Sequence, residues 1–156
     1  MAVSARPTSC GVIVTDGEKL LLGHATRSPR WDIPKGVAEP DEALAAAAAR
    51  ELLEETGLTV APEELTDLGV HAYLRGKDLA LFMWRPTRLP DPESLTCTSQ
   101  FALPNGTLMP EFDRFGLFLW DEAVIRVGKN LARILTAISR DVMLSSDRAS
   151  VSEKFT

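Results

Sequence analysis

The segment ARELLEET places Arg50 beside three glutamates, Glu51, Glu54 and Glu55. It follows the alanine-rich run 43–49, which strongly favours a helix, and residues three or four positions apart share one side of a helix. The carboxylates therefore repel one another at the C-terminal end of a helix, where the macrodipole favours cations. Local stability rules would avoid this arrangement, and a bound divalent cation would relieve it. Clustered carboxylates suit Mg²⁺ or Mn²⁺, bound together with a phosphate substrate.

An acidic helix face that only meets solvent is the alternative interpretation, but the flanking residues argue against it. Residues 36–58, GVAEPDEALAAAAARELLEETGL, resemble the box of the Nudix hydrolases, G-x5-E-x7-R-E-U-x-E-E-x-G-U, where U is apolar. Every defined position is filled at the right spacing, by Gly36, Glu42, Arg50, Glu51, Leu52, Glu54, Glu55, Gly57 and Leu58. The resemblance implies Mg²⁺-dependent hydrolysis of a nucleoside diphosphate linked to another moiety, with Mn²⁺ as a possible substitute.

The resemblance also implies roles for the charged residues of the box. Glu51, Glu54 and Glu55 would hold the metal and the phosphates and acidify a bound water. Glu54 or Glu51 would take the proton of that water, and the sequence does not separate ligand from base because both tasks use a carboxylate. Arg50 would orient Glu51 through a bidentate salt bridge or contact a phosphate.

Two further metal ligands are implied by the resemblance outside the helix. Members of the family often use a backbone carbonyl near Lys35 and Gly36. They also often supply one more carboxylate from the region before the last strand. Glu111 is our first candidate there and Asp113 the second, with an ordinary surface loop as the alternative.

Candidate substrate-binding residues surround the box. The ammonium of Lys35 can reach a phosphate, and Arg27 and Arg30, like His24, can meet a phosphate or a base or simply be solvated. His71 and Tyr73 share one face of a strand, where they line a base pocket or cover the sheet.

The resemblance suggests a substrate class as well. A Lys at position 35 and a Tyr at about the distance of Tyr73 past the box occur in family members that act on dinucleoside polyphosphates. Damaged nucleoside triphosphates, ADP-ribose and nucleotide sugars are alternatives. A catalytically silent module that binds a nucleotide is another, although such a module need not keep the whole carboxylate set.

The elements that must position these residues follow from periodicity and turn signals. Asp41 is a plausible N-cap of the box helix, with Glu42 in its first turn, and Gly57 a left-handed C-cap. The signal Asp16-Gly17 predicts a hairpin. We expect strands at 9–14, 19–25, 31–33, 58–60, 65–75, 79–84, 106–110 and 115–120, a turn of helix at 121–123, and an amphipathic helix at 129–144. This mixture fits an α/β/α sandwich with an antiparallel-rich sheet, which the resemblance makes Nudix-type.

The bulk properties set the remaining expectations. The 156 residues make one domain, with residues 1–8 and 145–156 flexible. The net charge of −5 argues against duplex nucleic acid as a partner and leaves a small-molecule nucleotide. With no signal peptide, no bilayer-spanning run and two cysteines, Cys10 and Cys97, outside any pairing motif, we expect a cytoplasmic protein with reduced thiols and no membrane contact. The loop 85–105 is a substrate-facing lid or a mobile insertion, and the C-terminal helix packs on the sheet or forms a homodimer contact.

Overall fold

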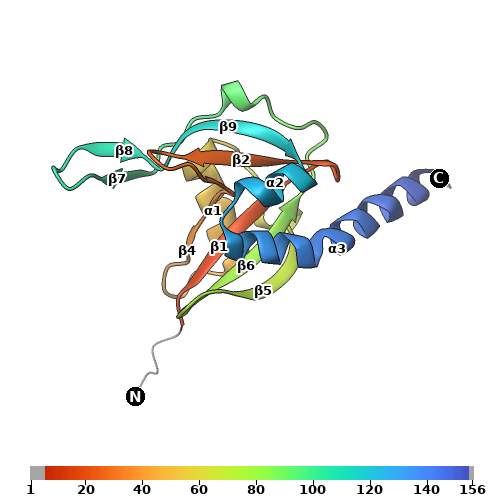
Figure 1. Cartoon of the computed structure of the whole chain (residues 1–156). Helices are drawn as coiled ribbons and strands as arrows, with labels where there is room; N and C mark the ends of the chain where they lie inside the picture. Colours follow the sequence, from red (N-terminus) through yellow and green to blue (C-terminus); the bar gives the residue numbers. More distant parts are fainter. Residues whose placement is uncertain (1–5, 155–156) are drawn as a thin grey trace, which may run out of the picture.

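The computed structural model describes the backbone of residues 6–154 and the side chains of residues 6–142. Its main sheet has the strand order β4-β1-β6-β5, in which β1 runs parallel to β6 and the other pairs are antiparallel (Figure 1). Its members are β1 (Thr8–Val14), β4 (Lys35–Val37), β5 (Thr66–Leu74) and β6 (Lys77–Trp84).

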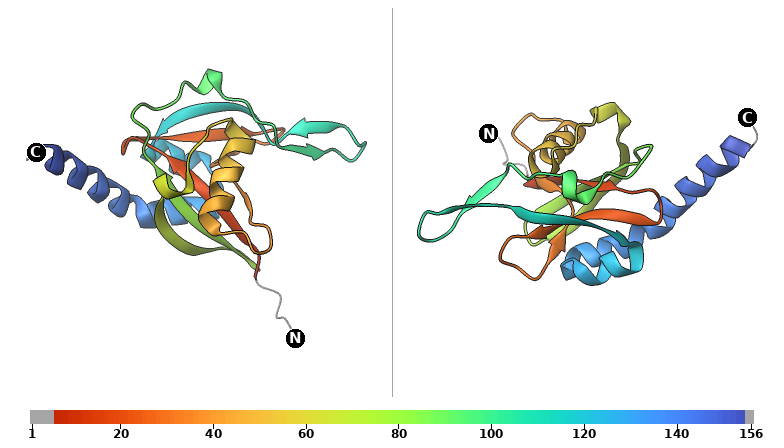
Figure 2. Two further views of the ribbon diagram at one scale, coloured as in Figure 1. Left: turned by 180° about the vertical axis from the view of Figure 1, so that it is seen from behind. Right: turned by 90° about the horizontal axis from the view of Figure 1, so that it is seen from above.

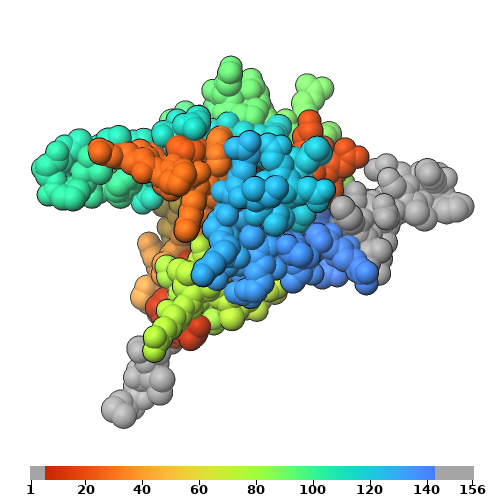
Figure 3. Space-filling model, viewed as in Figure 1, coloured from red at the N-terminus to blue at the C-terminus, as the bar shows by residue number. Residues whose placement is uncertain are grey.

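A second sheet and a projecting hairpin complete the strands. The second sheet has the order β3-β2-β9, made of β2 (Lys19–Ala25), β3 (Trp31–Asp32) and β9 (Phe112–Leu119). The hairpin of β7 (Gln100–Ala102) and β8 (Leu108–Pro110) extends away from the body, as the further views and the space-filling view show (Figures 2 and 3).

Helices cover both faces of the main sheet. On one face, Cys10, Val12 and Val14 of β1 pack in a core cluster with residues of α1 (Leu44–Thr56). On the other face, Ile13 packs in a second cluster with α2 (Trp120–Arg126) and α3 (Lys129–Lys154). Because helices bury both faces, β1 and β6 are almost continuously apolar. The predicted α/β/α sandwich is confirmed.

The hairpin predicted at Asp16-Gly17 is formed only around its turn. Thr15 and Leu20 make an antiparallel bridge across the turn, but β1 and β2 then belong to different sheets. Both hydrogen-bonding edges of β1 are already occupied, by β4 and β6. A turn signal is local and carries no information about these distant partners.

The start of the box helix also differs from its prediction. The N-cap is Ala43, without a side-chain hydrogen bond, and Asp41 lies before it with a φ of +64°. Glu42 therefore precedes the helix instead of occupying its first turn. The end is as predicted, because Gly57 adopts a φ of +84° and its N–H donates to the Leu53 carbonyl.

The other strands and helices follow the predictions with smaller changes. Residues 35–37 form β4, where no strand was predicted. Residues 58–60 form no strand, and Trp120 starts a helix instead of ending a strand. The last helix continues to Lys154, past its predicted end at 144. The predicted flexibility of the termini falls partly on residues 1–5 and 155–156, which lie outside the described residues.

Two further expectations concern the membrane and the thiols. Within the described residues, no helix combines the length and the apolar character needed to cross a membrane. Cys10 and Cys97 are both free, as expected.

Candidate active site

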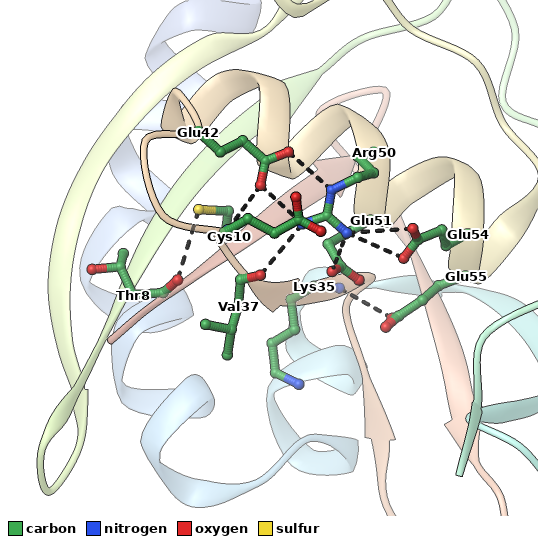
Figure 4. Close-up of polar contacts among 10 residues, drawn as sticks. Thr8, Cys10, Lys35, Val37, Glu42, Arg50, Glu51, Glu54 and Glu55 are labelled. Carbon is green, nitrogen blue, oxygen red and sulfur yellow. Dashed lines mark hydrogen bonds and ion pairs between the residues drawn. The ribbon is translucent and has the colours of Figure 1, made fainter. Parts of the chain in front are cut away.

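Arg50 is the centre of the ion pairs at the box helix (Figure 4). Its guanidinium binds both oxygens of Glu42, at 2.9 and 3.0 Å, and contacts Glu51 at 3.0 Å and Glu54 at 3.3 Å. The bidentate partner is thus Glu42, and not Glu51 as predicted from the resemblance. The hydrogen bonds from Arg50 lower the pKa of Glu42 to about 2, and the same pairing raises the pKa of Arg50.

Glu51 is buried against strand β4. Its exposed fraction is 8%, and a Cβ built on Gly36 would overlap its carboxylate. Glycine is therefore needed at residue 36 for the close approach of the helix side chain to the strand. Burial, followed by the charge of Glu54, raises the pKa of Glu51.

Glu55 is buried on the same side of the helix. Its exposed fraction is 6%, and its Oε1 accepts the main-chain N–H of Lys35 at 3.1 Å. Burial raises its pKa to about 8. A carboxylate that is buried beside other carboxylates gains from a cation, because the cation offsets both the desolvation and the repulsion.

Glu51 and Glu55 line a cavity of about 360 Å³ together with residues from distant parts of the chain. Glu111 reaches it from the turn between β8 and β9. The lining residues whose charged or hydroxyl side chains could contact a metal or a phosphate are Asp32, Lys35, Glu51, Glu55, Lys77, Ser99 and Glu111. The cavity is therefore lined by acidic residues and by lysines together.

Asp113 is separate from this cavity. It pairs with His24 at 2.8 Å and with Arg114 at 3.3 Å, and it lines a different pocket that also includes Cys97. The structure thus brings Glu111, and not Asp113, to the box residues.

Comparison with known proteins places this arrangement in a family. A family model described as the NUDIX domain matches residues 5–123. The chain belongs to the Nudix family. An uncharacterized 17.7 kDa protein of Enterobacteria phage T4 is 36% identical over 144 residues, covering 85% of this chain and 95% of the phage protein. A MutT-like protein of Streptomyces ambofaciens is 41% identical over 56 residues, which are 36% of each chain.

Solved Nudix structures share the fold. The crystal structure of an Ap4A hydrolase from C. elegans superposes with a TM-score of 0.63 at 21% identity, over 86% of this chain and 97% of that one. A Nudix hydrolase from Nitrosomonas europaea superposes with a TM-score of 0.57 at 22% identity, over 86% of this chain and 73% of that one. The Nudix-type sandwich expected from the sequence is confirmed.

The candidate metal ligands are all oxygen donors, the kind that Mg²⁺ prefers. They are Glu51, Glu54, Glu55 and the Gly36 carbonyl of the Nudix box, with Glu111 from outside the box, and all of these residues except Glu54 line the cavity. No three His, Cys, Asp or Glu side chains in the described part of the chain are grouped as a ready metal cage. Arg50 is instead the counter-ion of Glu51 and Glu54, and a main-chain N–H is the partner of Glu55.

The predicted substrate-binding residues are only partly brought together. Lys35 lines the cavity, but its ammonium pairs with Asp32 at 2.6 Å and points away from α1 (Figure 4). Arg27 and Arg30 are exposed in the turn between β2 and β3 and do not line the cavity. Tyr73 is half-buried against the core cluster, and burial raises its pKa.

Two further residues, His71 and Lys77, lie on strands of the main sheet. His71 contacts the carbonyl of Leu68 at 2.9 Å and is half-buried on β5 with Tyr73, so these two share a face as predicted. Lys77 lines the cavity and is not among the site residues predicted from the sequence. The parallel pairing that sets Thr8 opposite Asp78 brings Lys77 there, and no local signal could have indicated that pairing.

Proposed function

We propose that this Nudix protein is a divalent-metal-dependent hydrolase that cleaves the diphosphate bond of a nucleoside diphosphate linked to another moiety. The supporting observation is the burial of Glu51 and Glu55, at 8% and 6% exposure, on one cavity with Glu111. Burying a charged carboxylate costs free energy unless it is paired. A buried cluster of carboxylates therefore marks a cation site in this proposal.

Each box residue has a task in this proposal. Glu51, Glu54 and Glu55, with the Gly36 carbonyl and with Glu111 from outside the box, would hold the metal. When bound, Mg²⁺ would neutralise phosphate charge and acidify a water.

The chain itself supplies the general base and the residue that holds the carboxylates in position. Glu54 is our candidate base, because its side chain is 42% exposed and is therefore open to a water, whereas that of Glu51 is 11% exposed. Arg50 holds Glu51 and Glu54 in place while its other edge is fixed on Glu42.

Dinucleoside polyphosphates are the substrate class we propose. Lys35 and Lys77 both line the cavity that contains Glu51, Glu55 and Glu111, which suits a substrate with several phosphates. The Lys35 ammonium would have to leave Asp32 to contact one of them. Tyr73 lies on β5, which pairs with the strand that carries Lys77, but it packs against the core cluster and does not line the cavity. ADP-ribose, damaged nucleoside triphosphates and nucleotide sugars are the competing substrates in the test below.

The cytoplasmic location and the homodimer stay predictions.

The test is a product assay on diadenosine polyphosphates, ADP-ribose, nucleoside triphosphates and nucleotide sugars. Each is incubated with Mg²⁺, with Mn²⁺ or with chelator, using the wild-type chain, Glu54→Gln and the control Glu63→Gln. Glu63 is exposed in the short helix η1 (Pro62–Glu64), lies outside the box and does not line the cavity. We expect cleavage of diadenosine polyphosphates that needs metal, falls at least a hundredfold in Glu54→Gln and is unchanged in Glu63→Gln.

Other outcomes have defined meanings. Cleavage that survives both chelator and Glu54→Gln contradicts the proposed reaction. Metal-dependent cleavage of another substrate class alone keeps the reaction and rejects the proposed substrate. Calorimetry that shows tight nucleotide binding without any product supports the silent binding module instead.

A further inference from the structure

A short segment of the long loop after β6 lies across the C-terminal end of α1. We call this segment, residues 96–99, the strap. The main-chain N–H of Thr98 donates to the Glu54 carbonyl at 2.7 Å, the Thr98 hydroxyl donates to it at 2.9 Å, and the Ser99 N–H at 3.2 Å. The N–H of Thr96 donates to the Thr56 carbonyl at 3.1 Å. Three donors thus converge on one main-chain oxygen of a box glutamate.

The position of the strap has an electrostatic consequence. The last carbonyls of a helix have no partner within the helix, and they carry the negative end of its dipole. In α1 this end also bears Glu51, Glu54 and Glu55, so the negative charge is unusually dense. The N–H and O–H donors of the strap satisfy the carbonyls and offset part of that charge.

The strap also connects the helix to the remaining candidate ligand. The Ser99 carbonyl accepts the N–H of Glu111 at 2.8 Å, and the Glu111 carbonyl accepts the N–H of Thr26 at 3.1 Å. Ser99 itself lines the cavity with Glu111. The main chains of Glu54 and Glu111 are therefore joined through the strap by consecutive hydrogen bonds.

We propose that the strap is a positioning element of the carboxylate site and that Thr98 is its positioning residue. Thr98 fixes the main chain of Glu54, and through it the part of α1 from which Glu54 and Glu55 project. The inference rests on the proposed function, because it concerns the same metal ligands. It also gives a task to part of the loop 85–105, which the sequence left open between a lid and a mobile insertion.

The strap has a purely structural interpretation, in which it only caps a helix. In that case loss of the Thr98 hydroxyl lowers thermal stability but leaves the metal affinity of the folded protein unchanged. The two interpretations therefore differ in a binding measurement made well below the unfolding temperature.

The test compares Mn²⁺ binding, measured by calorimetry and by the electron paramagnetic resonance signal of free Mn²⁺. Thr98→Val removes the hydroxyl but keeps the N–H and a β-branched side chain, and Thr98→Ser restores the hydroxyl. Ser94→Ala is the matched control, because the Ser94 hydroxyl donates to the Asp91 carbonyl within the same loop. We expect affinity to fall about three- to tenfold in Thr98→Val, the range of one lost hydrogen bond, and to stay within twofold of wild type in the other two.

A double variant tests whether Thr98 acts through Glu54. Thr98→Val combined with Glu54→Gln should bind Mn²⁺ no more weakly than Glu54→Gln alone, since both changes remove the same contribution. Wild-type affinity in Thr98→Val, an equal loss in Ser94→Ala, or a fully additive loss in the double variant overturns the inference while the proposed function stands. A wild-type chain that binds no Mn²⁺ overturns the proposed function, and the inference with it.

Discussion

The carboxylate of Glu51 occupies the space that a side chain on Gly36 would need. Strand β4 and helix α1 thus meet at this pair, far apart in the chain but in contact in the fold. The contact brings the Gly36 main chain next to a buried carboxylate, which is the arrangement that a cation with oxygen ligands requires.

Gly36→Ala should therefore damage the site more than the fold. The added methyl group must displace the Glu51 side chain, at a cost of about 1–3 kcal/mol in the free energy of unfolding. We expect Mn²⁺ affinity to fall at least tenfold, measured by calorimetry. Gly128→Ala is the control, since a Cβ there meets only the flexible end of Arg30, at 3.4 Å. Equal Mn²⁺ affinities in the two variants would show that the Gly36–Glu51 contact is not needed.

The Glu42–Arg50 ion pair predicts a dependence of stability on acid. The pKa of Glu42 is lowered from 4.5 to about 2 in the folded chain, so folding favours its charged form. Its contribution to stability is complete above about pH 4.5 and is lost as pH falls towards about 2. Urea unfolding at pH 6, 4.5 and 3 should show a steeper loss of stability in wild type than in Glu42→Gln. Parallel losses in the two proteins would contradict this assignment.

The Lys35–Asp32 pair should contribute to stability because both side chains are largely buried. Their atoms are 2.6 Å apart, with 21% and 25% of the side chains exposed. Asp32→Asn leaves the Lys35 ammonium without its charged partner, and we expect a loss of about 1–3 kcal/mol in the free energy of unfolding. The double variant Asp32→Asn, Lys35→Met should regain part of this loss in urea unfolding. A double variant less stable than Asp32→Asn alone would count against the pair.

The two thiols should react at very different rates. Cys10 is fully buried and burial raises its pKa to about 11, whereas Cys97 is half-buried at the edge of a pocket. Intact-mass analysis after maleimide treatment should find one adduct on the native chain and two after denaturation. Cys97→Ser should give none in the native state. An adduct on Cys10 in the native Cys97→Ser protein would show that β1 is more accessible than its packing indicates.

Much of the site was predictable because its signal is local. The spacing of Glu51 and Glu55 within one helix places both on the buried side that lines the cavity, and Gly57 ends the helix because glycine readily adopts a positive φ. The family resemblance added Gly36 and the choice of Glu111. The box residues lie within one stretch, and Gly36 and Glu111 match a known pattern. Predicting them therefore required no knowledge of the tertiary fold.

The parts that sequence reasoning missed depend on distant contacts. Asp41 had the right type for an N-cap, yet Glu42 pairs with Arg50 instead of entering the first turn, and the helix starts later. The strap joins residues 98 and 54, and Lys77 reaches the cavity only through the pairing of β1 with β6. A turn or cap signal extends over only a few residues. Pairings between distant residues then decide which of the locally possible structures forms.

The central claim is that the buried box carboxylates bind a divalent cation. The most direct measurement is a calorimetric Mn²⁺ titration of the wild-type chain, Glu51→Gln and the exposed control Glu63→Gln. The account predicts saturable binding by wild type and Glu63→Gln, and an affinity at least tenfold lower in Glu51→Gln. Equal affinity in all three proteins, or no binding by wild type, would contradict it.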